Sequence, residues 1–220
     1  MILYRPIDGD VLSTSIHFKI KTCFLMRQLK DPIPPILEEM KRKLIAILSE
    51  GGIKIIDADS RTTGRDLLLK IWQIAISVPI GIALIHKGIK PKTIGNIFYE
   101  LGLMQALGKE TLIIKSPKVS IPSDFKGIEY VNYDENFERH IRDFISDLQE
   151  ERVEYYLELA DFVKNDPLLA IDYLRRAYLL TGDRQLQNRA KVVLKGAGLS
   201  ERANDSVEML LASFIYDNPH

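Results

Sequence analysis

The feature that most constrains the fold is the alternation of short, almost wholly apolar runs with longer stretches of helical periodicity. Five runs of strand length lie at residues 21–26, 53–56, 80–85, 111–114 and 128–131. Apolar residues recur at helical spacing after four of them, in 36–50, 66–77, 96–107 and 135–149. Strands that alternate with helices of this length predict βαβ units and a parallel sheet.

The runs are apolar throughout, which predicts a sheet whose two faces are both covered. We therefore expect an α/β fold in three layers, with a five-stranded, mainly parallel sheet of flavodoxin-like or TIR-like type. The 220 residues allow one to two domains. Residues 1–15 show no clear pattern.

The last third of the chain shows only helical patterns. Asp166-Pro167 opens one predicted helix, Thr181-Gly182-Asp183 forms a turn, and a last apolar helix is predicted at 207–216. This part resembles a single tetratricopeptide-type hairpin, which cannot bury its own face. We expect it to pack on the α/β domain or on another chain, so a homo-oligomer or a protein partner is predicted. The expected domains are residues 1–150 and the helical extension 151–220.

Composition excludes several function classes. Lys and Arg number 30, as do Asp and Glu, so the zero net charge gives no signal for nucleic acid or an acidic membrane. A single cysteine cannot form an intrachain disulfide or a Cys-rich zinc site, and the four histidines lack metal-ligand spacing. We predict no metal and no cofactor. We also predict a cytoplasmic protein, without a membrane span or a signal peptide.

Polar side chains follow the apolar runs where the carboxyl edge of the predicted sheet meets solvent. Ligands bind at this edge in open parallel sheets. The expected site residues are Arg27, Asp59 and His86, which follow the first three runs, and Asn96, Tyr99 and Glu100 at the start of the next helix.

Asn96 and Glu100 are four residues apart and share one face of that helix. A position near the helix N-terminus predicts an ionised Glu100, able to act as a nucleophile or to stabilise positive charge on a ribosyl carbon. The alternative is structural. In it, Glu100 complements the helix dipole and Asn96 caps the helix.

The segment from Gly95 to Lys109 is similar to the N-x-F-Y-E-L-G-x-x-x-A-L-G-K signature of the nucleoside 2-deoxyribosyltransferase-like, TIR-like family of nucleotide-binding proteins. Other motifs of that family have counterparts in order and with suitable spacing over about residues 20–148. They are Cys23–Met26, Asp57–Asp59 with Gly64 and Lys70–Trp72, and Ile121–Gly127 with Tyr133-Asp134.

The resemblance implies a nucleotide or nucleoside pocket above the carboxyl edge. It implies that Glu100 is the catalytic carboxylate, that Asp59 contacts sugar hydroxyls or the base, and that Asn96 positions the substrate. The implied chemistry is cleavage or transfer of an N-glycosidic bond without metal or redox steps, with an NAD-type substrate favoured. A prokaryotic defence role is also implied.

The chain departs from the family pattern at two places near the pocket. Arg27-Gln28 stands where the family has Pro-Phe, and Ala83–His86 stands where it has A-D-L-T. The following loop carries three lysines, which suit phosphates but also fit a pocket that no longer catalyses. Two alternatives to an enzyme therefore stay open: a nucleotide-sensing module that signals through its helical tail, and an assembly protein.

Overall fold

The computed structural model describes residues 17–58, 65–125, 127–163 and 165–196. Its strands are β1 (Thr22–Met26), β2 (Lys54–Ile56), β3 (Ile80–Ile85), β4 (Glu110–Lys115) and β5 (Tyr130–Asn132). Its α-helices are α1 (Pro35–Glu50), α2 (Arg65–Ser77), α3 (Pro91–Ala106), α4 (Phe137–Gln149), α5 (Glu151–Phe162), α6 (Pro167–Thr181) and α7 (Arg184–Gly196), and η1 (Ser123–Phe125) is a short 3₁₀ helix. The predicted 207–216 helix and the N-terminal 1–15 lie outside the described residues.

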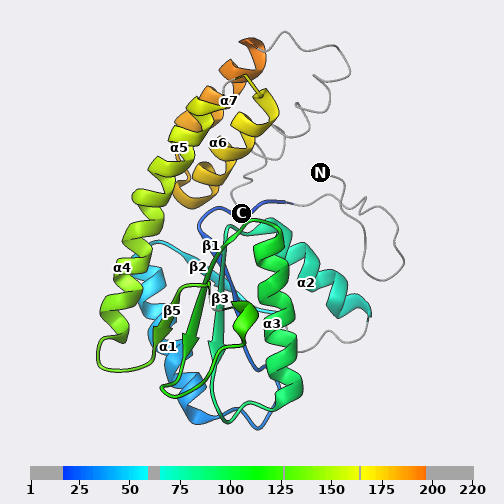
Figure 1. The fold of residues 1–220 in the computed structure, drawn as a ribbon, viewed down its shortest axis with the longest axis vertical. Coiled ribbons are helices and arrows are strands. Elements are labelled where there is room, and N and C mark those ends of the chain that lie inside the picture. Colours follow the sequence, from blue (N-terminus) through cyan, green and yellow to red (C-terminus); the bar gives the residue numbers. More distant parts are fainter. Residues whose placement is uncertain (1–16, 59–64, 126, 164, 197–220) are drawn as a thin grey trace. The chain divides into compact units, whose positions relative to one another are not determined.

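The five strands form one all-parallel sheet in the order β2-β1-β3-β4-β5 (Figure 1). Helices α1 and α4 cover one face of the sheet, and α2, α3 and η1 cover the other (Figure 1). The expected α/β fold with a helical C-terminal region is therefore confirmed. The order reverses between β1 and β3, because the chain leaves β1 toward β2 but leaves β3 toward β4.

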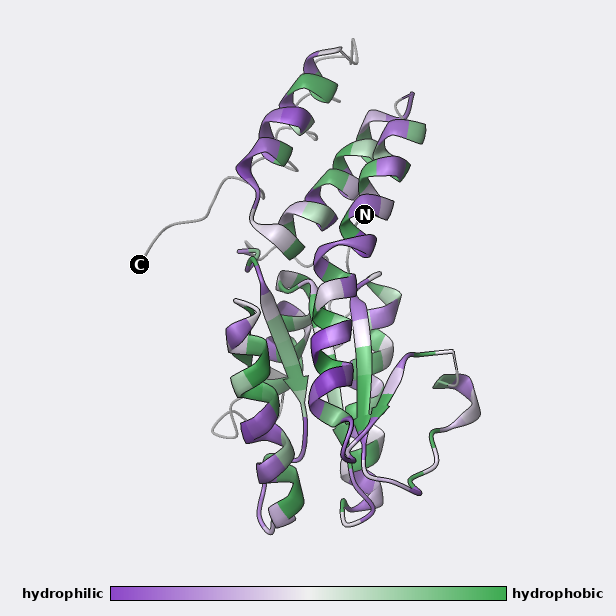
Figure 2. Ribbon diagram, turned by 90° about the vertical axis from the view of Figure 1, so that its left-hand side faces the viewer, coloured by the Kyte–Doolittle hydropathy of each residue, from purple (hydrophilic) through white to green (hydrophobic). Residues whose placement is uncertain are grey.

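Burial explains why these runs become strands. Every residue of β1 and β3 is buried, as expected for central strands covered on both sides. The edge strands β2 and β5 are short and partly exposed. Figure 2 shows the same contrast, with strands mostly green and helices that alternate between green and purple faces.

Contacts divide the chain into two compact units. Among the described residues, one unit is Thr22–Arg142, and the other combines His17–Lys21 with 143–196. The division falls inside α4, and a domain boundary after residue 150 stays a prediction. In the second unit α6 packs on both α5 and α7. The segment His17–Lys21 of this unit contacts α6 directly, because the Lys21 N–H donates to the Leu179 carbonyl oxygen at 2.8 Å.

Gly81 of β3 marks a close approach of α3 to the sheet. A Cβ at this position would lie 2.9 Å from the Met104 Cε of α3 and 3.1 Å from the Met26 Cε of β1. A branched side chain would therefore force both methionines to move. Gly95, on an exposed face of the same helix, has no atom within 4 Å of a Cβ position.

We expect Gly81→Val to lower the free energy of unfolding by about 1–3 kcal/mol, since it overpacks a filled core. The matched control is Gly95→Ala, which should raise the free energy of unfolding by about 0.5–1 kcal/mol because alanine favours the helix more than glycine does. Urea denaturation measures both. Equal stability of the Gly81→Val variant and the parent would contradict the close packing of α3.

Candidate functional site

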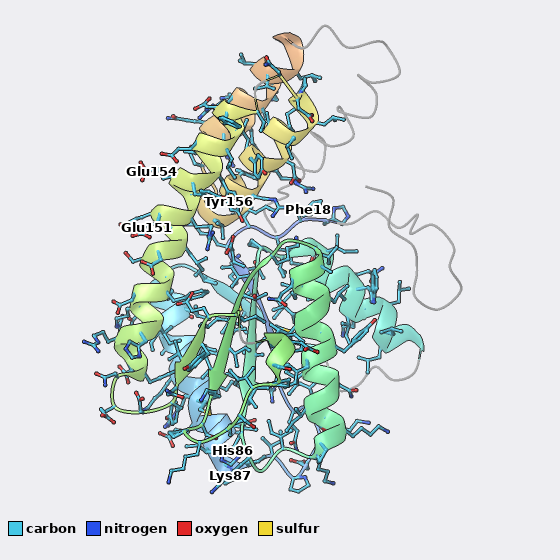
Figure 3. The ribbon with its side chains drawn as sticks, viewed as in Figure 1. Phe18, His86, Lys87, Glu151, Glu154 and Tyr156 are labelled. Atoms are coloured by element: carbon cyan, nitrogen blue, oxygen red, sulfur yellow. The ribbon has the colours of Figure 1, made fainter. Side chains whose placement is uncertain are left out.

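The site is built where β1 and β3 end side by side at the carboxyl edge of the sheet. Arg27 and Gln28 follow β1, and His86 follows β3. Figure 3 labels His86 and Lys87 at this edge. Because adjacent residues of a strand point to opposite faces, Arg27 and Gln28 lie on different sides of the sheet.

Arg27 lies on the α1 side and is held by carboxylates of the chain itself. Its Nη2 donates to Asp57 Oδ2 at 2.9 Å, its Nε donates to the same oxygen at 3.2 Å, and its Nη1 pairs with Glu38 Oε1 at 3.4 Å. The Arg27 side chain is only 11% exposed. These contacts tie the end of β1 to the end of β2 and to α1, a structural role that the sequence did not predict.

His86 is held in a defined tautomer. Its Nδ1 accepts a hydrogen bond from the Gly88 N–H at 2.9 Å, so the proton of the neutral ring resides on Nε2. Burial, with a smaller contribution from the charge of Lys87, lowers the pKa of His86 below its usual 6.5. His86 is therefore a neutral hydrogen-bond donor at pH 7.

Helix α3 begins at Pro91, five residues before the predicted start at Asn96. Proline fits the first turn of a helix, and the helix continues through Gly95, so residues 91–95 of the predicted loop are helical. Asn96 is an exposed residue within the helix and does not cap it. Tyr99 is 48% exposed, and its hydroxyl accepts a hydrogen bond from Trp72 Nε1 of α2 at 3.1 Å.

Glu100 is the tenth residue of α3 and is far from the first turn, where the helix dipole acts. Burial raises the pKa of Glu100 from 4.5 to about 7. Among the residues that the structure describes, none donates a hydrogen bond to this carboxyl group or pairs with it. Glu100 therefore lies away from the helix N-terminus that was expected to keep it ionised, and burial opposes its ionisation.

Helix and strand spacing place both Glu100 and Gln28 nearer the carboxyl edge than the methionines that pack on Gly81. Met104 and Met26 meet over Gly81, as described above. Glu100 lies one helical turn from Met104, about 6 Å toward the carboxyl edge. Gln28 lies two residues beyond Met26 on the same face of β1, about 6.6 Å toward the same edge.

Three further expectations concern Asp59, a metal site and a membrane span. Asp59 lies outside the described residues, and the structure brings together Arg27 with Asp57 rather than with Glu100. Within the described part of the chain, no cluster of three or more His, Cys, Asp or Glu residues has the arrangement of a metal site. A search of the same residues finds no helix long and apolar enough to cross a membrane.

No protein-family model matches the chain, and no curated protein matches its sequence. A search of solved structures finds a similarity to the CMP N-glycosidase BcmB of Clostridium botulinum. That structure is 20% identical and has a TM-score of 0.38; the match covers 56% of this chain and 97% of the glycosidase chain.

The Arg27 contacts predict a stability effect. We expect Arg27→Met to lower the free energy of unfolding by about 1–3 kcal/mol, because it removes charged hydrogen bonds from a mostly buried position. In an Asp57→Asn background the same change should cost less, since the partner charge is already absent. Arg139→Met at an exposed position of α4 is the control and should change stability by less than about 0.5 kcal/mol. Equal losses for Arg27→Met and the control would contradict the structural role.

The raised pKa of Glu100 predicts a pH dependence of stability. Between pH 4.5 and about 7 the folded chain keeps a proton that the unfolded chain has released, so folding stability falls as the pH rises through this range. The loss is at most about 3 kcal/mol. Glu100→Gln cannot titrate, so its stability relative to the parent should rise by this amount between pH 4.5 and pH 8. Parallel stability curves in urea titrations would contradict the burial of Glu100.

Proposed function

We propose that the protein cleaves or transfers the N-glycosidic bond of a nucleotide, with the Glu100 carboxyl group acting at the anomeric carbon. The observation that carries this proposal is a partly buried Glu100 carboxyl group, which has no partner among the described residues and whose pKa burial raises to about 7. Such a pKa leaves a useful fraction of carboxylate at neutral pH, while burial strengthens its attraction for a developing positive charge. The similarity of the Asn96–Lys109 segment to the transferase-like signature supports the same role.

The proposed reaction has two steps. The Glu100 carboxylate forms a bond to C1′ as the bond between C1′ and the base nitrogen breaks, and the base leaves with that electron pair. A pyrimidine or purine base then takes a proton from solvent, whereas the cationic nicotinamide of NAD leaves as a neutral molecule. Water attacks C1′ of the glycosyl ester, which gives the phosphorylated sugar, releases one proton to solvent and restores the carboxylate. If a second base attacks instead, the outcome is transfer.

The loop between β3 and α3 supports a nucleotide rather than a nucleoside as the substrate. Lys87, Lys90 and Lys92 are all exposed in this loop and at the start of α3. The positive end of the α3 dipole lies at the same edge, which favours a phosphate group. NAD is the substrate that the family resemblance favours, and a role as a prokaryotic defence effector is part of the same proposal.

A non-catalytic nucleotide sensor is the alternative. It is favoured by the neutral His86 ring at the end of β3, where the family motif carries an acidic residue. A sensor would bind nucleotides without base release. In that case the helical tail would pass the signal to a second copy or a protein partner, a contact that stays a prediction.

Base release tests the proposed activity. The purified protein is incubated with NAD, CMP and the matched nucleosides, and free base is followed by chromatography. We expect release from at least one nucleotide, reduced by about 100-fold or more in Glu100→Gln. The kcat/KM should rise with pH up to about 7 and then level off, because the ionised carboxylate is the reactive form.

Glu158→Gln, at an exposed position of α5, is the control and should leave release unchanged. Equal release by the Glu100→Gln variant would overturn the assignment of Glu100. Nucleotide binding, detected as a rise in melting temperature, without any release would favour the sensor.

A further inference from the structure

The first and last described helices of the helical unit carry opposite charges. Helix α5 has four acidic residues and one basic residue, so its formal charge is −3. Helix α7 has four basic residues and no acidic residue, so its formal charge is +4. Helix α6 packs on both of them. The zero net charge of the whole chain therefore hides an uneven distribution within this unit.

The acidic residues of α5 form a stripe on its outer face. Glu151, Glu154 and Glu158 are three and four residues apart, a spacing that places them on one side of a helix. All three are exposed, and none pairs with a cation of the described chain. Figure 3 labels Glu151 and Glu154 on the side of α5 away from α6, whereas Tyr156 lies on the α6 side and stacks on Tyr173.

The basic residues of α7 form the opposite stripe. Arg184, Lys191 and Lys195 are seven and four residues apart and lie on the face away from the buried Leu186 and Ala190. The three cations are exposed, and none pairs with a carboxylate among the residues that the structure describes. This unit thus presents one unpaired acidic face and one unpaired basic face.

The two stripes match in spacing. Glu154 and Glu158 are one helical turn apart, about 6 Å along the axis, and so are Lys191 and Lys195. Two helices that lie side by side can therefore form two ion pairs at once. A single chain cannot use the match in this way, because α6 lies between the two helices and packs on both.

An exposed apolar side chain borders each stripe. Phe162 follows Glu158 by one helical turn and is 85% exposed, and Val192 follows Lys191 and is 67% exposed. Ion pairs between exposed side chains are weak individually. Burial of the two apolar side chains would add a contribution that does not depend on salt.

We propose that the outer face of α5 in one copy of the chain binds the outer face of α7 in a second copy. Two different faces meet in such a contact, so each copy keeps one free face of either kind, and the assembly grows into an open chain or closes as a ring. The like charges within each stripe oppose pairing of α5 with α5 or of α7 with α7. This inference does not depend on the proposed function.

Analytical ultracentrifugation of the full chain tests the contact. At about 50 mM NaCl the weight-average mass should rise with protein concentration beyond that of a dimer. At about 500 mM NaCl it should fall toward that of one chain, because salt screens the exposed ion pairs.

Charge reversal tests which faces meet. The α5 variant combines Glu154→Lys with Glu158→Lys, and the α7 variant combines Lys191→Glu with Lys195→Glu. Each variant alone should associate at least about ten-fold more weakly than the parent, since like charges then face one another. An equimolar mixture of the two should associate again, because each reversed face meets a complementary face of the other variant.

Asp143→Lys with Asp147→Lys is the matched control. These residues are exposed on α4 and have the same spacing, and the double change adds the same charge as the α5 variant. The control should associate as the parent does. Because all of these positions are exposed, each variant should keep the free energy of unfolding of the parent to within about 0.5 kcal/mol per substitution.

Three results would overturn the proposal. The first is a parent that stays monomeric at every concentration. The second is association that both variants retain. The third is a mixture of the two variants that does not associate, since charge complementarity would then not be the cause of the loss. A monomeric parent whose α7 variant alone loses stability in urea would indicate that residues after Gly196 of the same chain cover the α7 face.

Discussion

The arrangement of the candidate site depends on the close approach of α3 to β3 at Gly81. The missing side chain there admits the Met104 and Met26 tips, which fixes the height and rotation of α3 above the sheet. One helical turn farther, this rotation carries Glu100 into partly buried surroundings. The packing of apolar atoms thus sets the protonation of the one carboxyl group that the proposed chemistry requires.

Much of the fold could be predicted because the central strands are apolar on both faces, a pattern that only a covered parallel sheet explains. The start of α3 could not be predicted, because Pro91 and Gly95 are residue types typical of loops. Proline nevertheless fits the first turn of a helix, and α3 begins at Pro91. The local sequence also predicted that Glu100 lies near a helix N-terminus. Its pKa depends instead on burial by the tertiary structure, which residue spacing does not reveal. Arg27 was identified as polar and near the site, but its ion pairs to Asp57 and Glu38 join residues far apart in sequence.

The sheet face on which Gln28 lies could be predicted from the sequence, but its hydrogen bonds could not. Strand alternation alone places it on the face of Met26, opposite to Arg27. Nothing in the sequence indicates that its amide nitrogen binds the Lys30 and Pro32 carbonyls and leaves the oxygen without a partner. The hydrogen bonds of Gln28 therefore come from tertiary structure, as does the burial that raises the pKa of Glu100.

Within the described residues, the chain passes between the two units twice, once before β1 and once within α4, because His17–Lys21 belong to the helical unit. One of these attachments is Lys21, which is bonded directly to the first residue of β1. Arg27 follows the other end of that five-residue strand, so a single short strand separates the N-terminal segment of the helical unit from the ion pairs of Arg27 with Asp57 and Glu38.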